Sequence, residues 1–136
     1  MKLRKSNSEK KEVALKIPKI EKITFNFSFI TNQNGYDLLS NKEIHSKFIE
    51  RVMALSSQNF VNVLMLKREQ GFEQIPDREI KYINCPTEFV NSHRNFESGD
   101  KFWVFRLSNK GRVVGKMIDK TYYVIGIDTK FDSYKH

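Results

Sequence analysis

Residues 101–128 read KFWVFRLSNKGRVVGKMIDKTYYVIGID. This stretch contains three runs rich in Val, Ile, Phe, Tyr and Trp, namely FWVFRL, RVVGKMI and TYYVIGI, with SNKG and DK between them. Runs of this composition that alternate with turn residues are typical of strands, so the stretch predicts a three-stranded antiparallel β-meander. Arg106, Arg112 and Lys116 lie inside the runs rather than in the turns, and a functional hypothesis has to account for them.

A separate strand is predicted near the start of the chain. Ile23, Phe25, Phe27 and Phe29 alternate with polar residues, which is the period expected when one face of a strand is buried and the other is in water. The dipeptide Asn34-Gly35 then predicts a turn.

Two consecutive helices are predicted between this turn and Gly71. Ser40 and Glu43 have the spacing of a capping box, which places the start of the first helix at Asn41. Apolar residues then recur at helical spacing and predict a buried stripe on each helix. The stripes consist of Ile44, Phe48, Val52 and Leu55 on the first helix, and of Phe60, Val61, Leu64 and Met65 on the second.

Residues 72–100 carry weaker signals. The run IKYI at 80–83 predicts a short strand, and residues 85–100 predict a long loop, which in a compact domain is either functional or disordered. The full order of strand, two helices, short strand and antiparallel meander predicts an α+β fold with the helices packed on the sheet.

The chain has 136 residues and a formal net charge of +8, most of which lies near its start. Residues 1–19 contain seven Lys or Arg residues against Glu9 and Glu12. Their polar composition predicts a flexible basic arm, which is either a solubilising tail or a segment that contacts phosphate or a partner. Residues 20–136 are predicted to form one domain, which is long enough to bury an ordinary core.

Several classes of chemistry have no support in the sequence. Cys85 is the only cysteine, which excludes an internal disulfide and a multi-cysteine metal site. Phosphate-loop, GxSxG, HExxH and CxxC motifs do not occur, so we expect no metal and no cofactor. No apolar run approaches the roughly 20 residues that span a bilayer, and the charged start lacks a secretory signal. We therefore expect a cytoplasmic protein with no membrane partner.

The three charged residues of the meander share even numbering. If the first hairpin closes with a loop at 109–111, Arg106, Arg112 and Lys116 lie on one face of the sheet and form a basic strip. Trp103 and Phe105 would then face the core. Such a strip on an open, concave sheet surface suits RNA phosphate, and Tyr122 beside it would stack on a base.

A structural alternative exists for part of this strip. If the second hairpin loop spans 119–121, Arg112 lies directly opposite Asp128, and an ion pair across the strands explains both residues without a ligand.

The order of elements resembles that of the RelE/ParE superfamily of small bacterial toxins. The run VFRLSNKGRVVGKMIDKTYYVIGID is similar to the stretch of that superfamily in which a basic strand residue, a turn, an Arg-hydrophobic-hydrophobic strand and a final apolar strand follow one another. The end of the chain also resembles small prophage and mobile-element proteins that close with a GR-hydrophobic-hydrophobic-G strand, an aromatic strand, an Asp and a final Tyr. Here these are residues 111–115, 122–127, Asp128 and Tyr134.

The resemblance implies roles for individual residues. Arg106 and Arg112 correspond to phosphate and transition-state ligands, and Tyr134 and His136 to groups that stack on a base and transfer a proton. Lys116 would support them, and the remaining expected RNA contacts are Lys101 and Tyr122.

The expected function is that of a RelE-type toxin-like RNA endonuclease, or another inhibitor of translation, that uses no metal. Its expected partners are RNA or the ribosome, with an antitoxin in addition. The alternatives are a non-enzymatic phage or mobile-element protein that binds a host protein on the same scaffold, and a simple nucleic-acid binder, whose affinity would fall steeply with salt.

Overall fold

The computed structural model describes residues 21–135, so the predicted basic arm and His136 lie outside the described residues. A five-stranded sheet with the strand order β1-β5-β4-β3-β2 forms the centre of the protein. β1 runs parallel to β5, and the other neighbours are antiparallel. The strands are β1 (Thr24–Asn26), β2 (Phe72–Pro76), β3 (Lys101–Arg106), β4 (Arg112–Ile118) and β5 (Thr121–Asp128).

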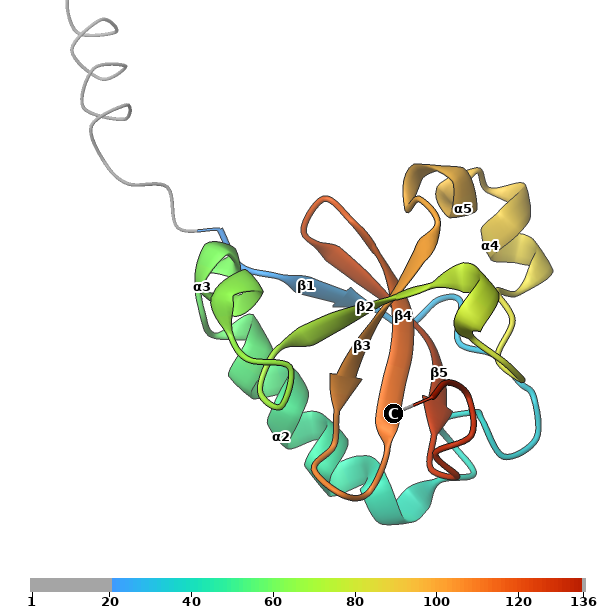
Figure 1. Ribbon diagram of the computed structural model, residues 1–136, viewed down its shortest axis with the longest axis horizontal. Helices are drawn as coiled ribbons and strands as arrows, with labels where there is room; N and C mark the ends of the chain where they lie inside the picture. Colours follow the sequence, from blue (N-terminus) through green and yellow to red (C-terminus); the bar gives the residue numbers. More distant parts are fainter. Residues whose placement is uncertain (1–20, 136) are drawn as a thin grey trace, which may run out of the picture.

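Helices cover both faces of this sheet. One side carries η1 (Lys42–Ile44), α2 (His45–Ser56) and α3 (Phe60–Met65), whereas η2 (Asp77–Glu79), α4 (Thr87–Asn91) and α5 (Arg94–Glu97) follow β2. Figure 1 shows α2 and α3 along one flank of the sheet and α4 and α5 on the opposite flank. The predicted α+β class and the predicted meander are therefore confirmed. Within residues 21–135, no helix combines the length and apolar character needed to cross a membrane.

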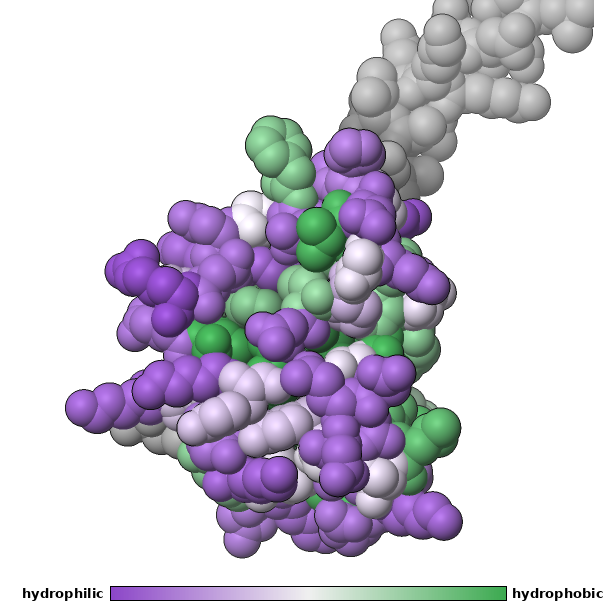
Figure 2. All heavy atoms as spheres, turned by 90° about the vertical axis from the view of Figure 1, so that its right-hand side faces the viewer, coloured by the Kyte–Doolittle hydropathy of each residue, from purple (hydrophilic) through white to green (hydrophobic). Residues whose placement is uncertain are grey.

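The sheet separates two apolar cores. The helix-side core contains Phe48 and Leu55 of α2 and Phe105 of β3. The opposite core, called the tail-side core because it includes Tyr134, also contains Phe89 of α4. Figure 2 looks onto the flank with α4 and α5, which is largely hydrophilic except for a hollow across its middle where hydrophobic atoms are visible. Both faces of the sheet are thus covered, and the sequence-based expectation of an open basic surface is wrong.

The first strand is shorter than its alternating pattern predicts. β1 ends at Asn26, whose side-chain oxygen accepts a hydrogen bond from the backbone N–H of Ser28 and turns the chain. As a result, Phe25 packs in the helix-side core, Phe27 is 45% exposed, and Phe29 packs in the tail-side core.

The helices of the first half depart from prediction in their details. The helical region begins at Lys42, next to the predicted start, but the Ser40 hydroxyl donates to Asp37, so the capping box does not form. The second helix ends at Met65, well before Gly71. Its predicted stripe is right for Phe60, which packs against the helix-side core, and wrong for Val61, Leu64 and Met65, which are exposed. Val63 is the buried residue of this helix.

Residues 72–100 contain more regular structure than their sequence suggests. The strand lies at Phe72–Pro76 and not at 80–83. Its pairing with β3 ends at Pro76, and a 3-10 turn follows, so residues 80–83 are no longer beside β3. The predicted loop at 85–100 contains α4 and α5, and it packs onto the sheet through the fully buried Phe89.

The register of the second hairpin decides where Tyr122 lies. The turn consists of Asp119 and Lys120, with Ile118 opposite Thr121, and a bulge after Val114 shifts the register by one residue. Because the turn has only two residues, Met117 is opposite Tyr122, and Tyr122 faces the helix-side core. The predicted position of Tyr122 beside the basic strip assumed a longer turn and is wrong. The ring of Tyr122 lies over Gly115, where an added Cβ would be only 2.6 Å from this ring.

Candidate functional site

The register of β3 and β4 brings two arginines together. Arg106 and Arg112 are directly opposite each other at the end of the first hairpin, as expected for one face of the sheet. Trp103 and Phe105 face the helix-side core, which agrees with the prediction for the opposite face. Like charges directly opposite across strands repel each other, so this pair needs a compensating group.

Glu73 of β2 supplies the compensating charge. Its Oε1 atom lies 3.7 Å from Nε of Arg106, and both side chains are largely buried, with 16% and 20% exposure. The same carboxylate oxygen accepts a hydrogen bond of 2.7 Å from the hydroxyl of Tyr134. Glu73 thus connects β3 to the C-terminal tail through its ion pair with Arg106 and its hydrogen bond with Tyr134.

Backbone carbonyls, Phe131 and Tyr134 hold the side chain of Arg112 in place. Its Nη1 atom donates hydrogen bonds of 3.0 Å to the carbonyls of Ser108 and Gly111, and its guanidinium lies 4.9 Å from the centre of the Phe131 ring. Arg112 is only 9% exposed, yet its buried Nε atom has no hydrogen-bond partner within the described part of the chain, and the same is true of Nε of Arg106. Buried N–H donors are almost always paired in proteins, so these two are exceptions that call for a reason.

We call these five residues, Glu73, Arg106, Arg112, Phe131 and Tyr134, the tail cluster. Burial raises the pKa of the Tyr134 phenol well above its ordinary value, and the hydrogen bond to Glu73 raises it further, while the charge of Arg112 opposes the shift. The phenol is therefore protonated at neutral pH and donates its hydrogen bond to Glu73.

Asp128 shapes the tail that carries Phe131 and Tyr134. Its fully buried carboxylate accepts hydrogen bonds from the backbone N–H groups of Lys130, Asp132 and Ser133 and from the Ser133 hydroxyl. Burial alone would raise the pKa of Asp128, but these hydrogen bonds outweigh burial, and the pKa is lowered. Phe131 adopts a φ of 58° in this turn, a conformation that is uncommon for a residue with a side chain.

The predicted ion pair between Arg112 and Asp128 is wrong, although the two residues are opposite each other in the register. The carboxylate is turned toward the tail, where four donors satisfy it, and no ion pair joins the two side chains within residues 21–135. The predicted position of Arg112 opposite Asp128 in the register is nevertheless right. The turn is one residue shorter than assumed, and the bulge after Val114 restores the alignment.

The other basic residues expected at the site lie elsewhere. Lys116 is on the predicted face but is fully buried, with its Nζ atom 2.6 Å from Asp77, 3.4 Å from the carbonyl of Gly99 and 4.3 Å from the centre of the Phe102 ring. Lys101 is exposed at the start of β3, at the far end of that strand from Arg106. Neither lysine takes part in the tail cluster.

An open groove adjoins the tail cluster. It has a volume of about 470 Å³ and is lined by Arg78, Glu79, Lys81, Phe131, Asp132, Tyr134 and Lys135. A backbone hydrogen bond of 2.6 Å from Lys81 to Ser133 holds its two walls together. We call it the tail groove.

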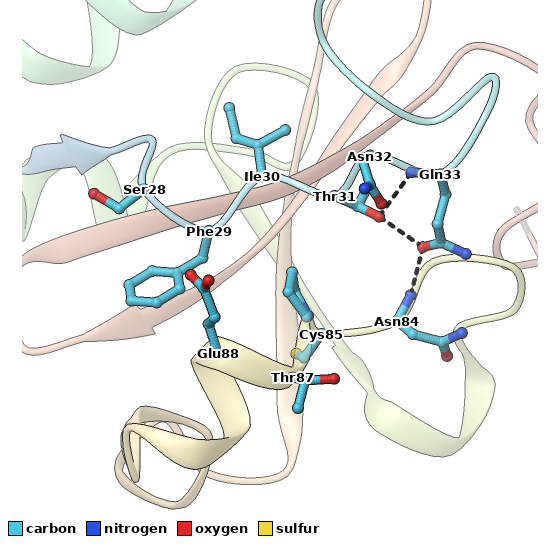
Figure 3. Close-up of a pocket in the computed structure, with 11 residues that line it drawn as sticks. Ser28, Phe29, Ile30, Thr31, Asn32, Gln33, Asn84, Cys85, Thr87 and Glu88 are labelled. Atoms are coloured by element: carbon cyan, nitrogen blue, oxygen red, sulfur yellow. Dashed lines mark hydrogen bonds between the residues drawn. The ribbon is translucent and has the colours of Figure 1, made fainter.

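A second groove, of about 530 Å³, lies between residues 28–33 and 84–88 (Figure 3). Gln33 bridges its walls, because its side-chain oxygen accepts from the Thr31 hydroxyl and from the backbone N–H of Asn84. Burial raises the pKa of the Cys85 thiol to about 11, so this cysteine is protonated and is a poor nucleophile at neutral pH. No group of three or more His, Cys, Asp or Glu side chains suited to a metal occurs within residues 21–135.

Sequence reasoning missed two members of the tail cluster. Glu73 lies in a five-residue strand that contains Pro76 and no clear alternation, so its sequence offered no signal for a buried carboxylate. Phe131 follows the last strand, and its contact with Arg112 depends on the turn around Asp128. Arg106, Arg112 and Tyr134 were identified from the sequence, and the fold brings these three together.

The chain matches no protein-family model, no curated protein and no solved structure. The resemblance to RelE/ParE toxins therefore stays a hypothesis that depends on the order of elements and on the residues quoted for it.

Proposed function

We propose that the protein is a RelE-type RNA endonuclease that acts at the tail cluster. The observation that supports this proposal is the convergence of Arg106, Arg112 and Tyr134, which come from two strands and the tail. Two arginines placed opposite each other destabilise a sheet, and a purely structural role does not require them. Their buried Nε atoms also have no hydrogen-bond partner within residues 21–135, which is uncommon for arginines with a purely structural role.

The proposed reaction is attack of a ribose 2′-OH on the adjacent phosphate. A bond forms from the 2′ oxygen to phosphorus, and the bond from phosphorus to the 5′ oxygen breaks. The two guanidinium groups stabilise the extra negative charge of the transition state, an effect that is often the largest in such reactions.

Tyr134 relays the proton in this proposal. Its hydroxyl receives the proton of the 2′-OH while passing its own to Glu73, with which it shares a hydrogen bond of 2.7 Å. The raised pKa of the phenol fits a relay, because the group is protonated before and after the transfer. His136, two residues after Tyr134, is assigned the protonation of the leaving 5′ oxygen.

Expression in a bacterial host tests the proposal. The wild-type chain is expected to arrest growth and translation, and the double variant Arg106→Ala with Arg112→Ala is expected to be harmless. The double variant Lys42→Ala with Lys67→Ala removes the same charge from exposed positions outside the tail cluster and serves as the control. A harmless wild-type protein, or equal arrest by both double variants, contradicts the proposal.

A separate surface favours the second candidate function, non-enzymatic binding of a host protein. Leu39, Ile49 and Met53 are 78%, 54% and 63% exposed, and a shallow apolar groove of about 310 Å³ contains the first two. Exposed apolar surface of this kind often marks a protein interface. This function predicts a nuclease-resistant complex with one host protein that Ile49→Glu abolishes and Arg112→Ala leaves intact.

A further inference from the structure

The tail groove contains three cations that the proposed reaction does not use. Arg78, Lys81 and Lys135 are exposed along its two walls, and none of them forms an ion pair with another residue in the range 21–135. Of the two acids in the groove, Asp132 already accepts a hydrogen bond from the hydroxyl of Tyr36. The groove thus carries three cations against the two carboxylates of Glu79 and Asp132.

The floor of the groove is also suited to an anion. Phe131 and Tyr134 line it, and the guanidinium of Arg112 contacts the Phe131 ring and is hydrogen-bonded to Tyr134. Arg112 is nine-tenths buried and keeps an unpartnered Nε donor, so its charge adds to the positive potential of the groove without being neutralised by a carboxylate.

We propose that the tail groove binds the backbone phosphates of single-stranded RNA through Arg78, Lys81 and Lys135 and guides the strand to the tail cluster. This inference rests on the proposed function, because it takes RNA as the substrate. Phe131 is partly exposed, whereas Tyr134 is buried. Cations along a groove with an accessible aromatic ring are typical of single-strand binding, where the charges follow the backbone and rings contact bases. The backbone hydrogen bond from Lys81 to Ser133 links the two walls, so that the cations of both lie along one groove.

Salt-dependent binding of a fluorescent single-stranded oligouridylate to the full chain tests the inference. The triple variant Arg78→Gln, Lys81→Gln and Lys135→Gln is compared with a control triple variant, Lys42→Gln, Lys67→Gln and Arg68→Gln, which removes the same charge from exposed positions outside the groove. The N-terminal residues are identical in both, so their contribution cancels. Thermal melting of each variant checks that it is folded.

Each lost phosphate contact on a single strand lowers the slope of log affinity against log salt by about 0.7, so the groove variant is expected to lose about 2 in slope. Its affinity at about 0.1 M salt is expected to fall about 100-fold, while the control variant stays close to wild type. Equal slopes and affinities for the two triple variants would overturn the inference. Binding of fluorescent polyglutamate, but not of the oligouridylate, that the groove variant loses would also overturn it, in favour of an acidic peptide.

The same preparations separate this inference from the proposed function. A wild-type chain that binds RNA through the groove but neither cleaves it nor arrests growth refutes the endonuclease and supports the groove. A chain that cleaves RNA equally well with and without the three groove cations supports the endonuclease and refutes the groove.

Discussion

Two buried cations of β4, Lys116 and Arg112, lie on the same face of the sheet in very different surroundings. The ammonium of Lys116 has a carboxylate at 2.6 Å, a carbonyl and an aromatic ring as neighbours. The guanidinium of Arg112 has two carbonyls, the Tyr134 hydroxyl and a ring as neighbours, faces Arg106 across the strands, and keeps a buried Nε donor without a hydrogen-bond partner within residues 21–135. The surroundings of Lys116 are those of a residue that stabilises the fold, and the contrast agrees with our proposal that Arg112 contacts a ligand.

The largest expected effect on stability belongs to Lys116. Lys116→Ala removes one partner of a buried ion pair and leaves space for the lost side chain, a change that typically costs about 3–5 kcal/mol. We expect about 3 kcal/mol, because the side chain of Asp77 is 40% exposed and regains water. Denaturant unfolding measures this loss. Lys120→Ala, which removes an exposed ion pair with Glu21, is the control and should cost at most about 1 kcal/mol. Equal losses for the two variants would show that Lys116 is not a stabilising residue.

A smaller loss is expected when the tail turn is weakened. Asp128→Asn replaces a charged acceptor of four hydrogen bonds, and we expect a loss of about 2 kcal/mol. The pH dependence gives a sharper test. The folded-state pKa of Asp128 is lowered, so its stabilising contribution is complete above the unfolded value of about 3.9 and is lost as the pH falls through the folded pKa. The variant should therefore lose less stability on acidification below about pH 4 than the wild type. An unchanged acid profile contradicts this role.

The smallest expected effect concerns Glu73. Glu73→Gln removes the charge but keeps the shape, and its amide oxygen can still accept the hydrogen bond of Tyr134, so we expect a loss of about 1 kcal/mol. The pKa of Tyr134 should fall, because the carboxylate contributes to its upward shift. Ultraviolet titration of the tyrosines, with Tyr134→Phe to identify the signal, measures the change. A pKa of Tyr134 that does not move would remove Glu73 from the proposed proton relay.

The parts of the fold that follow local rules could be predicted. Residues 101–128 form the meander because their composition and turn residues agree with each other, and the placement of Arg106 opposite Arg112 follows from the hairpin alone. Tyr122 was misplaced because the second turn has two residues and not three, which pairs Met117 with Tyr122 and turns Tyr122 to the other face. The sequence does not distinguish these two turn lengths.

The site could be predicted only in part, for a related reason. Arg106, Arg112 and Tyr134 stand out by residue type and position, but the character of their surroundings depends on contacts between distant segments. Glu73 reaches them only because β2 pairs with β3, and Lys116 is buried only because residues after β2 fold back over the sheet. Long-range pairing of this kind leaves no periodic signal in a single sequence.

The central claim is that Arg112 and not Lys116 belongs to the functional site. Cleavage of a single-stranded RNA by the purified full chain, measured for wild type, Arg112→Gln and Lys116→Met at equal concentrations of folded protein, tests it most directly. We predict that Arg112→Gln cleaves about 100- to 1,000-fold more slowly, as expected for the loss of a transition-state ligand, and that Lys116→Met cleaves at the wild-type rate. Cleavage by Arg112→Gln at the wild-type rate, or no cleavage by the wild-type chain itself, would contradict the claim.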